Sequence, residues 1–209
     1  PSLVGSHLGH IESSATAAGE LAARLQQYAG LRPPTKASTA PDAMFGDLKG
    51  LGESTCGRAA TVTYHRRPPL PNINGDAAAL RQVALNLIVN ARDALPSDNG
   101  QLQISLTRSD EARADLLDPV FGGHLADGPY VVLTIEDNGH GMDEQTLRHL
   151  FDPFYSTRGE GRGLGLAAVC GIVRAHRGPL RVRSSPGHGA RFSLFLPIAA
   201  KHEHIDDAS

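Results

Sequence analysis

Hydrophobic residues recur every three or four positions between residues 76 and 96, which is the spacing of one face of an α-helix. Asp76 is a suitable N-cap before this run, and Pro96 ends it. The apolar stripe consists of Leu80, Val83, Ala84, Leu87, Ile88, Ala91 and Leu95. We therefore predict an amphipathic helix whose apolar face packs against the core of a domain.

Similar patterns divide the following residues into alternating strands and helices. The expected elements are a short helix from Asp42, strands at 61–65, 101–108 and 130–137, a helix at 164–178, and a hairpin of strands 180–185 and 190–197. A polar insertion with a weak pattern covers residues 109–129. Strands that alternate with helices predict an α/β fold, here a two-layer sandwich of a mixed sheet against helices.

The N-terminal residues carry a separate pattern. Residues 8–30 have an apolar stripe at helical spacing, and Gly30 suits a helix C-cap. A stretch rich in Pro, Ser and Thr follows and is typical of a linker. We therefore divide the chain into an amphipathic helix region at 1–31, a linker at 32–41, the α/β domain at 42–198 and a polar tail at 199–209.

A second, polar stripe runs along the helix expected at 76–96. It consists of Gln82, Asn86, Asn90 and Asp93, which are spaced three or four residues apart. Asparagine is a poor helix former because its side chain competes for backbone hydrogen bonds. One interpretation is a solvent-facing side of the helix. The other is a ligand face, because amide and carboxylate oxygens are hard donors suited to Mg²⁺ that is held jointly with phosphates.

The strand at 130–137 ends in a carboxylate on its apolar face. Val131, Leu133, Ile135 and Asp137 share one side of the strand, so Asp137 needs a partner or a ligand. Gly139 and Gly141 follow, and their missing side chains allow a ligand to approach the backbone. The alternative interpretation is an ordinary turn at the end of a strand.

A glycine-rich stretch precedes the helix at 164–178. Glycines at 159, 161, 163 and 165 lead into the helix N-terminus, which is a general arrangement for binding phosphate. The stretch is not a P-loop, because no Gly-Lys-Ser/Thr follows, and no strand runs directly into it as in a dinucleotide-binding motif.

Composition adds limits to these interpretations. The formal net charge is −2, which gives no electrostatic case for nucleic acid binding. The two cysteines, Cys56 and Cys170, lack metal-ligand spacing, so we expect free thiols in a reducing compartment. No segment has the apolar length of a membrane span, and we expect a cytoplasmic location for this region, with any membrane anchor outside the chain.

The motifs occur in an order that resembles the ATP-binding domain of sensor histidine kinases, a family related to DNA gyrase, the heat-shock chaperone ATPase and the mismatch-repair ATPase. The resemblance covers about residues 41–198 and includes the Bergerat-type fold. The matching segments are "NLIVNARDA" for the N box, "DNGHGM" and "GRGLGL" for the two glycine boxes, "FDPFYST" for the F box and "PGHGARFSLFLP" for the closing hairpin. Residues 8–30 resemble the second helix of the kinase dimerisation hairpin.

The resemblance implies ATP and Mg²⁺ as cofactors and assigns roles to single residues. Asn90 would bind Mg²⁺ with Asn86 beside it, and Asp137 would accept the adenine amino group. Residues 155–165 would form a lid, in which Arg158 lies near the phosphates. The remaining implied nucleotide-binding residues are Asp93, Gly139, Gly141, Met142, Thr157, Gly161, Arg162, Gly163, Leu164, Gly165 and Leu166.

The resemblance also implies the reaction and its partners. The γ-phosphoryl group would pass to a histidine on a dimerisation helix and then to the aspartate of a response-regulator receiver domain, in a protein that is a homodimer at full length. Neither His7 nor His10 stands in the family's phosphoacceptor pattern, so we expect that histidine outside this chain. Hydrolysing members of the superfamily carry glutamate where this chain has Asn86, and an amide cannot act as a general base.

Two other functions stay open from the sequence. The lid is short, Arg162 replaces a small hydroxyl residue, and Ala190 stands where the hairpin often has threonine. These departures favour a non-catalytic module that senses nucleotide or binds a partner. The third possibility is an ATP-hydrolysing member of the same superfamily.

Overall fold

The computed structural model describes residues 38–57, 60–110, 128–156, 163–176 and 178–199. In chain order the elements are β1 (Ser38–Thr39), α2 (Pro41–Cys56), β2 (Ala60–Arg66), β3 (Ile73–Asn74), α3 (Ala77–Ala94), β4 (Gly100–Ser109), β5 (Tyr130–Asp137), α4 (Glu144–His149), α5 (Gly165–Ala175), β6 (Leu180–Ser184) and β7 (Ala190–Pro197). The helix expected at 8–30 and most of the insertion at 109–129 lie outside the described residues.

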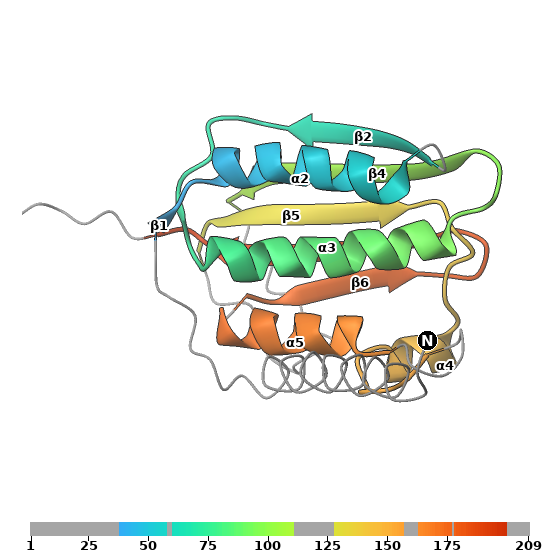
Figure 1. Ribbon diagram of the computed structural model, residues 1–209. Coiled ribbons are helices and arrows are strands. Elements are labelled where there is room, and N and C mark those ends of the chain that lie inside the picture. Colours follow the sequence, from blue (N-terminus) through green and yellow to red (C-terminus); the bar gives the residue numbers. More distant parts are fainter. Residues whose placement is uncertain (1–37, 58–59, 111–127, 157–162, 177, 200–209) are drawn as a thin grey trace, which may run out of the picture.

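A five-stranded mixed sheet forms one layer of the domain, in the order β2-β4-β5-β7-β6. β2 and β4 are parallel, and the other neighbouring strands are antiparallel. The helices α2, α3 and α5 lie side by side across one face of this sheet (Figure 1). The predicted two-layer α/β sandwich with a mixed sheet is therefore confirmed.

The core lies between the three helices α2, α3 and α5 and the inner face of the sheet. The apolar stripe predicted for α3 is buried from Leu80 to Ala91. Asp76 caps this helix, because its Oδ1 accepts hydrogen bonds from the backbone N–H groups of Ala78 (2.9 Å) and Ala79 (3.1 Å). Along β5 the inward side chains are almost fully buried, and Asp137 ends the same row. The predicted helix start and strand face are both confirmed.

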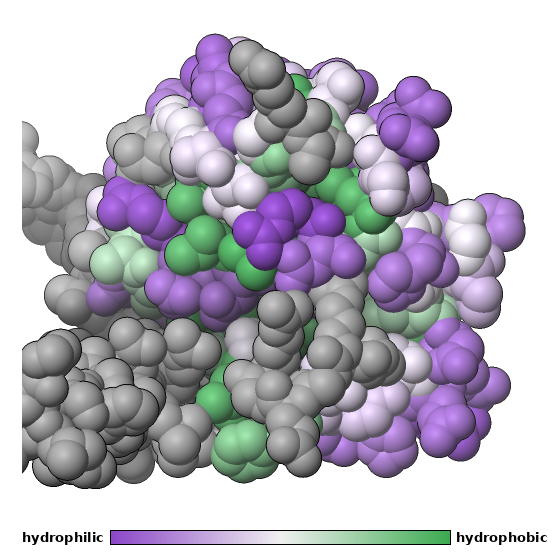
Figure 2. Space-filling view, turned by 45° about the vertical axis from the view of Figure 1, so that its right-hand side comes forward, coloured by the Kyte–Doolittle hydropathy of each residue, from purple (hydrophilic) through white to green (hydrophobic). Residues whose placement is uncertain are grey.

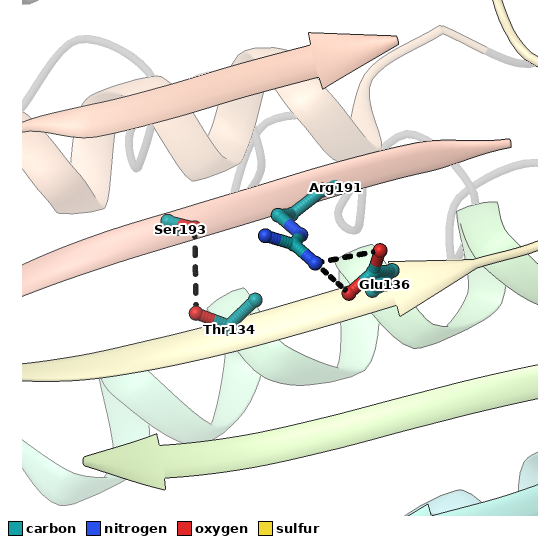
Figure 3. Close-up of polar contacts among 4 residues, drawn as sticks. All are labelled: Thr134, Glu136, Arg191 and Ser193. Atoms are coloured by element: carbon teal, nitrogen blue, oxygen red, sulfur yellow. Dashed lines mark hydrogen bonds and ion pairs between the residues drawn. The ribbon is translucent and has the colours of Figure 1, made fainter. Parts of the chain in front are cut away.

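The opposite face of the sheet is polar near the centre. Thr134 on β5 lies 3.3 Å from Ser193 on β7, and Arg191 forms an ion pair with Glu136 at 2.6 Å (Figure 3). These pairs stand directly across from each other in the β5–β7 register. The second half of β5 therefore has one buried face and one polar face, whereas Tyr130 and Val132 at its start are buried on the outer side as well.

Three local features differ from the sequence-based expectations. The helix expected to be short extends over 16 residues as α2, and it begins at Pro41, inside the expected linker. β1 also lies in that linker and pairs with β3, in a segment where no strand was expected. α4 has no counterpart among the expected elements, although Asp143 caps it through the Thr146 N–H at 2.7 Å.

Tertiary packing explains why α2 is longer than its pattern indicates. Its three glycines weaken the helical signal in the sequence. At Gly52, a Cβ atom would lie 2.7 Å from the hydroxyl oxygen of Tyr64 on β2 and 3.3 Å from Ile104 on β4. The glycine therefore lets the helix lie close to the sheet, and the contact offsets its low helix propensity.

Candidate functional site

A cavity of about 820 Å³ lies between α3, the segment after β5, α4 and the start of α5. Most of the expected site residues line it: Asn86, Asn90, Asp93, Asp137, Gly141, Met142, Gly163, Leu164, Gly165 and Leu166. Gly139 is not in the lining, and Thr157, Arg158, Gly161 and Arg162 lie outside the described residues. Viewed toward the end of the molecule that carries α4, hydrophobic residues are exposed between hydrophilic ones in the middle of the surface (Figure 2).

Asp137 is the buried carboxylate of this cavity, with a side chain that is 5% exposed. Its Oδ1 accepts hydrogen bonds from the backbone N–H groups of Gly139 (2.9 Å) and Ala190 (3.3 Å). Both of these bonds go to the same oxygen, which leaves Oδ2 for a ligand. The carboxylate is therefore held in one orientation by its own backbone neighbours.

Burial raises the pKa of Asp137 above its ordinary value. The two backbone N–H groups and the nearby His140 lower the pKa, and Glu136 raises it further, but loss of solvation is the largest effect. Removing a carboxylate from water is costly unless the group gains compensating partners. A ligand that donates a hydrogen bond to Oδ2 would supply such a partner.

The segment that follows Asp137 is held by the turn between β6 and β7. The N–H of Gly189 donates to the carbonyl of Gly139 (2.9 Å), and the N–H of Gly187 donates to the carbonyl of His140 (2.7 Å). Ser184 Oγ accepts from the Met142 N–H at 2.9 Å and donates to the Gly189 carbonyl at 2.6 Å. This turn therefore fixes the backbone on both sides of Gly141.

The glycines of this region serve close backbone packing. A Cβ atom at Gly139 would lie 2.5 Å from the carbonyl oxygen of Ala94, and one at Gly141 would lie 2.0 Å from that of Ser185. Gly141 also has a φ of +68°, which favours glycine. The sequence suggested that these glycines admit a ligand to the backbone; the structure gives them the additional role of letting three chain segments meet.

Asn86 and Asn90 project from α3 into the cavity, as the polar stripe predicts. Asn86 is engaged at both ends of its amide: Oδ1 accepts from Gln82 (3.0 Å), and Nδ2 donates to the carbonyl of Gly165 (3.1 Å). Asp93 forms an ion pair with its neighbour Arg92 at 2.6 Å. The stripe is therefore a wall of the cavity, and Asn86 joins that wall to α5.

The start of α5 borders the other side of the cavity. Its N-cap, Leu164, makes no side-chain capping bond, so the first N–H groups of the helix receive no capping side chain. Gly163 has a φ of +110°, and a Cβ atom there would lie 2.6 Å from the carbonyl oxygen of Tyr155. An uncapped helix N-terminus beside a glycine suits an anionic ligand.

Several lining residues were missed by sequence reasoning. Leu85 and Val89 stand beside the polar stripe on α3, at the spacing of one helical turn, so this signal was readable in the sequence. Leu150 lines the cavity directly after α4, a helix that the sequence did not predict, and Tyr155 lines it from the first position of the expected lid. Together they give the cavity apolar walls that a flat ring can contact.

The described part of the chain offers no metal cluster of its own. Within the described ranges, no group of three or more His, Cys, Asp or Glu side chains is arranged to hold a metal ion. Cys56 and Cys170 are both buried, and neither forms a disulfide. None of the helices that the structure describes is long and apolar enough to cross a membrane.

Comparison with known proteins identifies related sequences. Residues 75–200 match the family described as histidine kinase-, DNA gyrase B-, and HSP90-like ATPase. The chain is 33% identical over 170 residues to the sensor kinase CckA of Brucella abortus. The aligned region makes up 79% of this chain and 17% of that protein. It is 40% identical over 130 residues to the signal transduction histidine-protein kinase AtoS of Escherichia coli. This aligned region makes up 62% of this chain and 18% of that protein. The chain thus spans less than a fifth of the length of these relatives.

Solved structures share the fold. The catalytic domain of the histidine kinase ThkA superposes with a TM-score of 0.61 at 19% identity, over 78% of this chain and 96% of that one. Full-length ShkA in complex with AMPPNP gives a TM-score of 0.69 at 23% identity, over 96% of this chain and 40% of that one. The family match covers more than half of the chain, so the chain belongs to the histidine kinase-, DNA gyrase B- and HSP90-like ATPases, and it is a homologue of sensor histidine kinases.

Proposed function

We propose that this chain binds Mg-ATP in the cavity and transfers the γ-phosphoryl group to a histidine outside the chain. That histidine would pass the group to the aspartate of a response-regulator receiver domain in two-component signalling. The observation that carries the proposal is the placement of Asp137, Asn90 and the start of α5 around one cavity. The relatives are sensor kinases, and the similar ShkA structure is a complex with AMPPNP.

The end of the cavity at Asp137 suits adenine. Adenine carries an amino group that donates hydrogen bonds, whereas guanine carries a carbonyl oxygen at the same position of the ring. Oδ2 of Asp137 can accept a hydrogen bond from the amino group of adenine, but it repels the carbonyl oxygen of guanine. The side chains of Val89, Met142 and Leu150 add apolar surface for the faces of the base. We therefore expect the site to select ATP over GTP.

The end of the cavity at α5 suits the phosphates. The uncapped N-terminal turn of α5 offers backbone N–H groups, and Asn90 offers a neutral amide oxygen from α3. The described residues hold no metal cluster of their own, so Mg²⁺ fits here only if phosphate oxygens complete its coordination. When bound, the ion would neutralise charge on the β- and γ-phosphates.

The chain's own part in the reaction is then positioning. Asp137 and the apolar walls hold the base, while Gly163 and the first turn of α5 orient the phosphate chain. Asn86 is a neutral amide, so it cannot serve as the general base for an attacking water. Transfer to a histidine needs only an aligned acceptor and a stabilised γ-phosphoryl group.

Asn90→Ala tests the metal assignment. We expect the variant to weaken Mg-ATP binding by about 10-fold, the effect of losing one contact to a charged group. In EDTA, variant and wild type should bind ATP with equal affinity, because the amide acts through Mg²⁺. Calorimetric titration measures both; an equal loss with and without Mg²⁺ would contradict the role of Asn90.

Asn86→Glu tests the choice between transfer and hydrolysis. We expect the variant to hydrolyse ATP faster than wild type, since a positioned general base typically contributes about 10²-fold or more. Asn86→Gln is the matched control, because it lengthens the side chain without supplying a base. Phosphate release under multiple-turnover conditions is the measurement. Equal rates in all three proteins would mean that Asn86 does not decide between the two reactions.

The partners and the setting belong to the same proposal. We infer that residues 1–31 form part of a dimerisation helix, that 32–41 links it to the catalytic domain at 42–198, and that 199–209 is a tail. The full-length protein would act as a homodimer in the cytoplasm, where ATP is available. The lid would bring Thr157, Arg158, Gly161 and Arg162 to the phosphates.

A further inference from the structure

A chain of two amides connects α3 to α5 at the phosphate end of the cavity. Gln82 Nε2 donates to Asn86 Oδ1 at 3.0 Å, and Asn86 Nδ2 donates to the carbonyl oxygen of Gly165 at 3.1 Å. Gln82 lies one helical turn before Asn86 and also lines the cavity. The two side chains are partly buried, so each bond is shielded from competing water.

The direction of this chain is fixed by chemistry. A backbone carbonyl only accepts hydrogen bonds, so the atom of Asn86 that faces Gly165 must be the nitrogen. Asn86 Oδ1 then faces Gln82, and the atom of Gln82 that meets it must be a donor. The Gly165 carbonyl on α5 therefore sets the orientation of the Asn86 amide, and the Asn86 amide in turn sets that of Gln82.

The bond from Asn86 to the Gly165 carbonyl joins α3 to the first turn of α5. Leu164, the N-cap, supplies no side-chain bond, and the first turn is held otherwise by bonds such as Ala168 N–H to the Leu164 carbonyl (2.9 Å). Before the helix, the Gly163 carbonyl accepts from the Phe154 N–H at 3.2 Å. Asn86 thus connects α3 to the segment expected to meet the phosphates.

We propose that Gln82 is a positioning residue: it supports Asn86 in the orientation that the Gly165 carbonyl requires, and so helps to hold the first turn of α5 for triphosphate binding. The inference rests on the proposed function, since it assigns the phosphate end of the same site. Gln82 acts here through Asn86. Its Nε2 holds Asn86 Oδ1, which keeps Nδ2 directed at the Gly165 carbonyl.

Gln82→Glu reverses the chain of amides. A carboxylate cannot donate to Asn86 Oδ1, so two acceptors would face each other about 3 Å apart unless the Asn86 amide rotates. If it rotates, Oδ1 faces the Gly165 carbonyl, and the tie to α5 is lost. One of the two contacts must break in either case. Gln82→Met removes the donor without adding an acceptor, so Asn86 keeps its bond to Gly165.

Nucleotide affinity is the first measurement. We expect Gln82→Glu to weaken Mg-ATP binding about 10-fold, Gln82→Met to weaken it about 2- to 3-fold, and both to bind adenosine within about 2-fold of wild type. Adenosine lacks phosphates, so a general loss of structure would lower both affinities. Equal losses for ATP and adenosine, or a Met variant as weak as the Glu variant, would overturn the positioning role.

A double-mutant cycle separates orientation from added charge. In an Asn86→Ala background there is no amide to orient, so Gln82→Glu should cost no more than about 2-fold in Mg-ATP affinity. If its cost there equals the cost in wild type, the effect is charge repulsion with the phosphates, and the proposal fails.

Hydrogen exchange tests the proposal without nucleotide. We expect Gln82→Glu to speed amide exchange in residues 164–169, the first turn of α5, about 5- to 10-fold, and Gln82→Met, which only removes the donor to Asn86, to speed it about 2-fold. Unchanged exchange in the Glu variant would overturn the inference. If wild type binds no nucleotide, the proposed function fails, but the exchange result still decides whether Gln82 positions α5.

Discussion

Asp137→Asn should remove most of the ATP affinity while leaving the domain folded. In the wild type, the N–H groups of Gly139 and Ala190 both donate to Oδ1. An asparagine keeps an acceptor at that position, so its NH₂ group must point into the cavity. There it would face the amino group of adenine, donor against donor. An unsatisfied buried contact of this kind costs about 1–3 kcal/mol, or roughly 5- to 150-fold in affinity.

Glu136→Gln is the matched control for this variant. Glu136 precedes Asp137, but it lies on the polar face of the sheet in an ion pair with Arg191 (Figure 3). We expect it to bind ATP as wild type does. The ratio of ATP to GTP affinity, measured by titration, should fall in Asp137→Asn alone. Unchanged ATP affinity in Asp137→Asn would remove Asp137 from the base-binding site.

The stability of Asp137→Asn should move in the opposite direction to its affinity. Burial raises the pKa of Asp137, so the folded state holds the proton more tightly than the unfolded state does. Ionisation therefore costs folding free energy as the pH rises through the raised pKa. The asparagine avoids this cost, and its free energy of unfolding at pH 7 should equal or exceed that of wild type. The difference in the free energy of unfolding between variant and wild type should shrink below pH 3.8, the ordinary pKa of aspartate, because Asp137 is then protonated in both the folded and the unfolded state.

Gly189→Ala should destabilise the domain and the site together. Gly189 has a φ of +66°, and a Cβ atom there would lie 1.9 Å from the carbonyl oxygen of Asp137. The turn between β6 and β7 would have to move away from β5, breaking the bond from the Gly189 N–H to the Gly139 carbonyl. We expect a loss of about 2–3 kcal/mol in the free energy of unfolding, measured by urea denaturation. ATP affinity should fall as well, because the same turn supports Asp137.

Gly187→Ala separates backbone strain from close packing. Gly187 lies in the same turn with a φ of +76°, but nothing lies within 4 Å of a Cβ atom built on it. The free energy of unfolding of Gly187→Ala should fall by only about 1 kcal/mol, the cost of a left-handed backbone for a residue with a side chain. Equal losses in the two variants would mean that the approach of the turn to Asp137 does not contribute to stability.

The strongest sequence patterns predicted the elements that carry the site. The periodicity of α3 and the alternation along β5 both arise from one buried face, so Asn86, Asn90 and Asp137 could be placed on their elements in advance. The match to the kinase boxes then predicted that these elements would meet, and the cavity brings them together.

Features that depend on distant contacts could not be predicted from local pattern. The pairing of β1 with β3 joins residues more than 30 positions apart, in stretches without strand periodicity. The need for glycine at 189 arises from the carbonyl of Asp137, which only the pairing of β5 with β7 brings near. The bond between Asn86 and Gly165 likewise exists only once α3 and α5 pack together.

Calorimetric titration with a non-hydrolysable ATP analogue is the decisive experiment for the proposed nucleotide site. It should be made with and without Mg²⁺, with GTP as the competing base and Asp137→Asn as the negative control. We expect binding that is stronger with Mg²⁺, selective for adenine and lost in the variant. Failure of the wild-type chain to bind either nucleotide would contradict the proposed function and favour a module that acts through a protein partner.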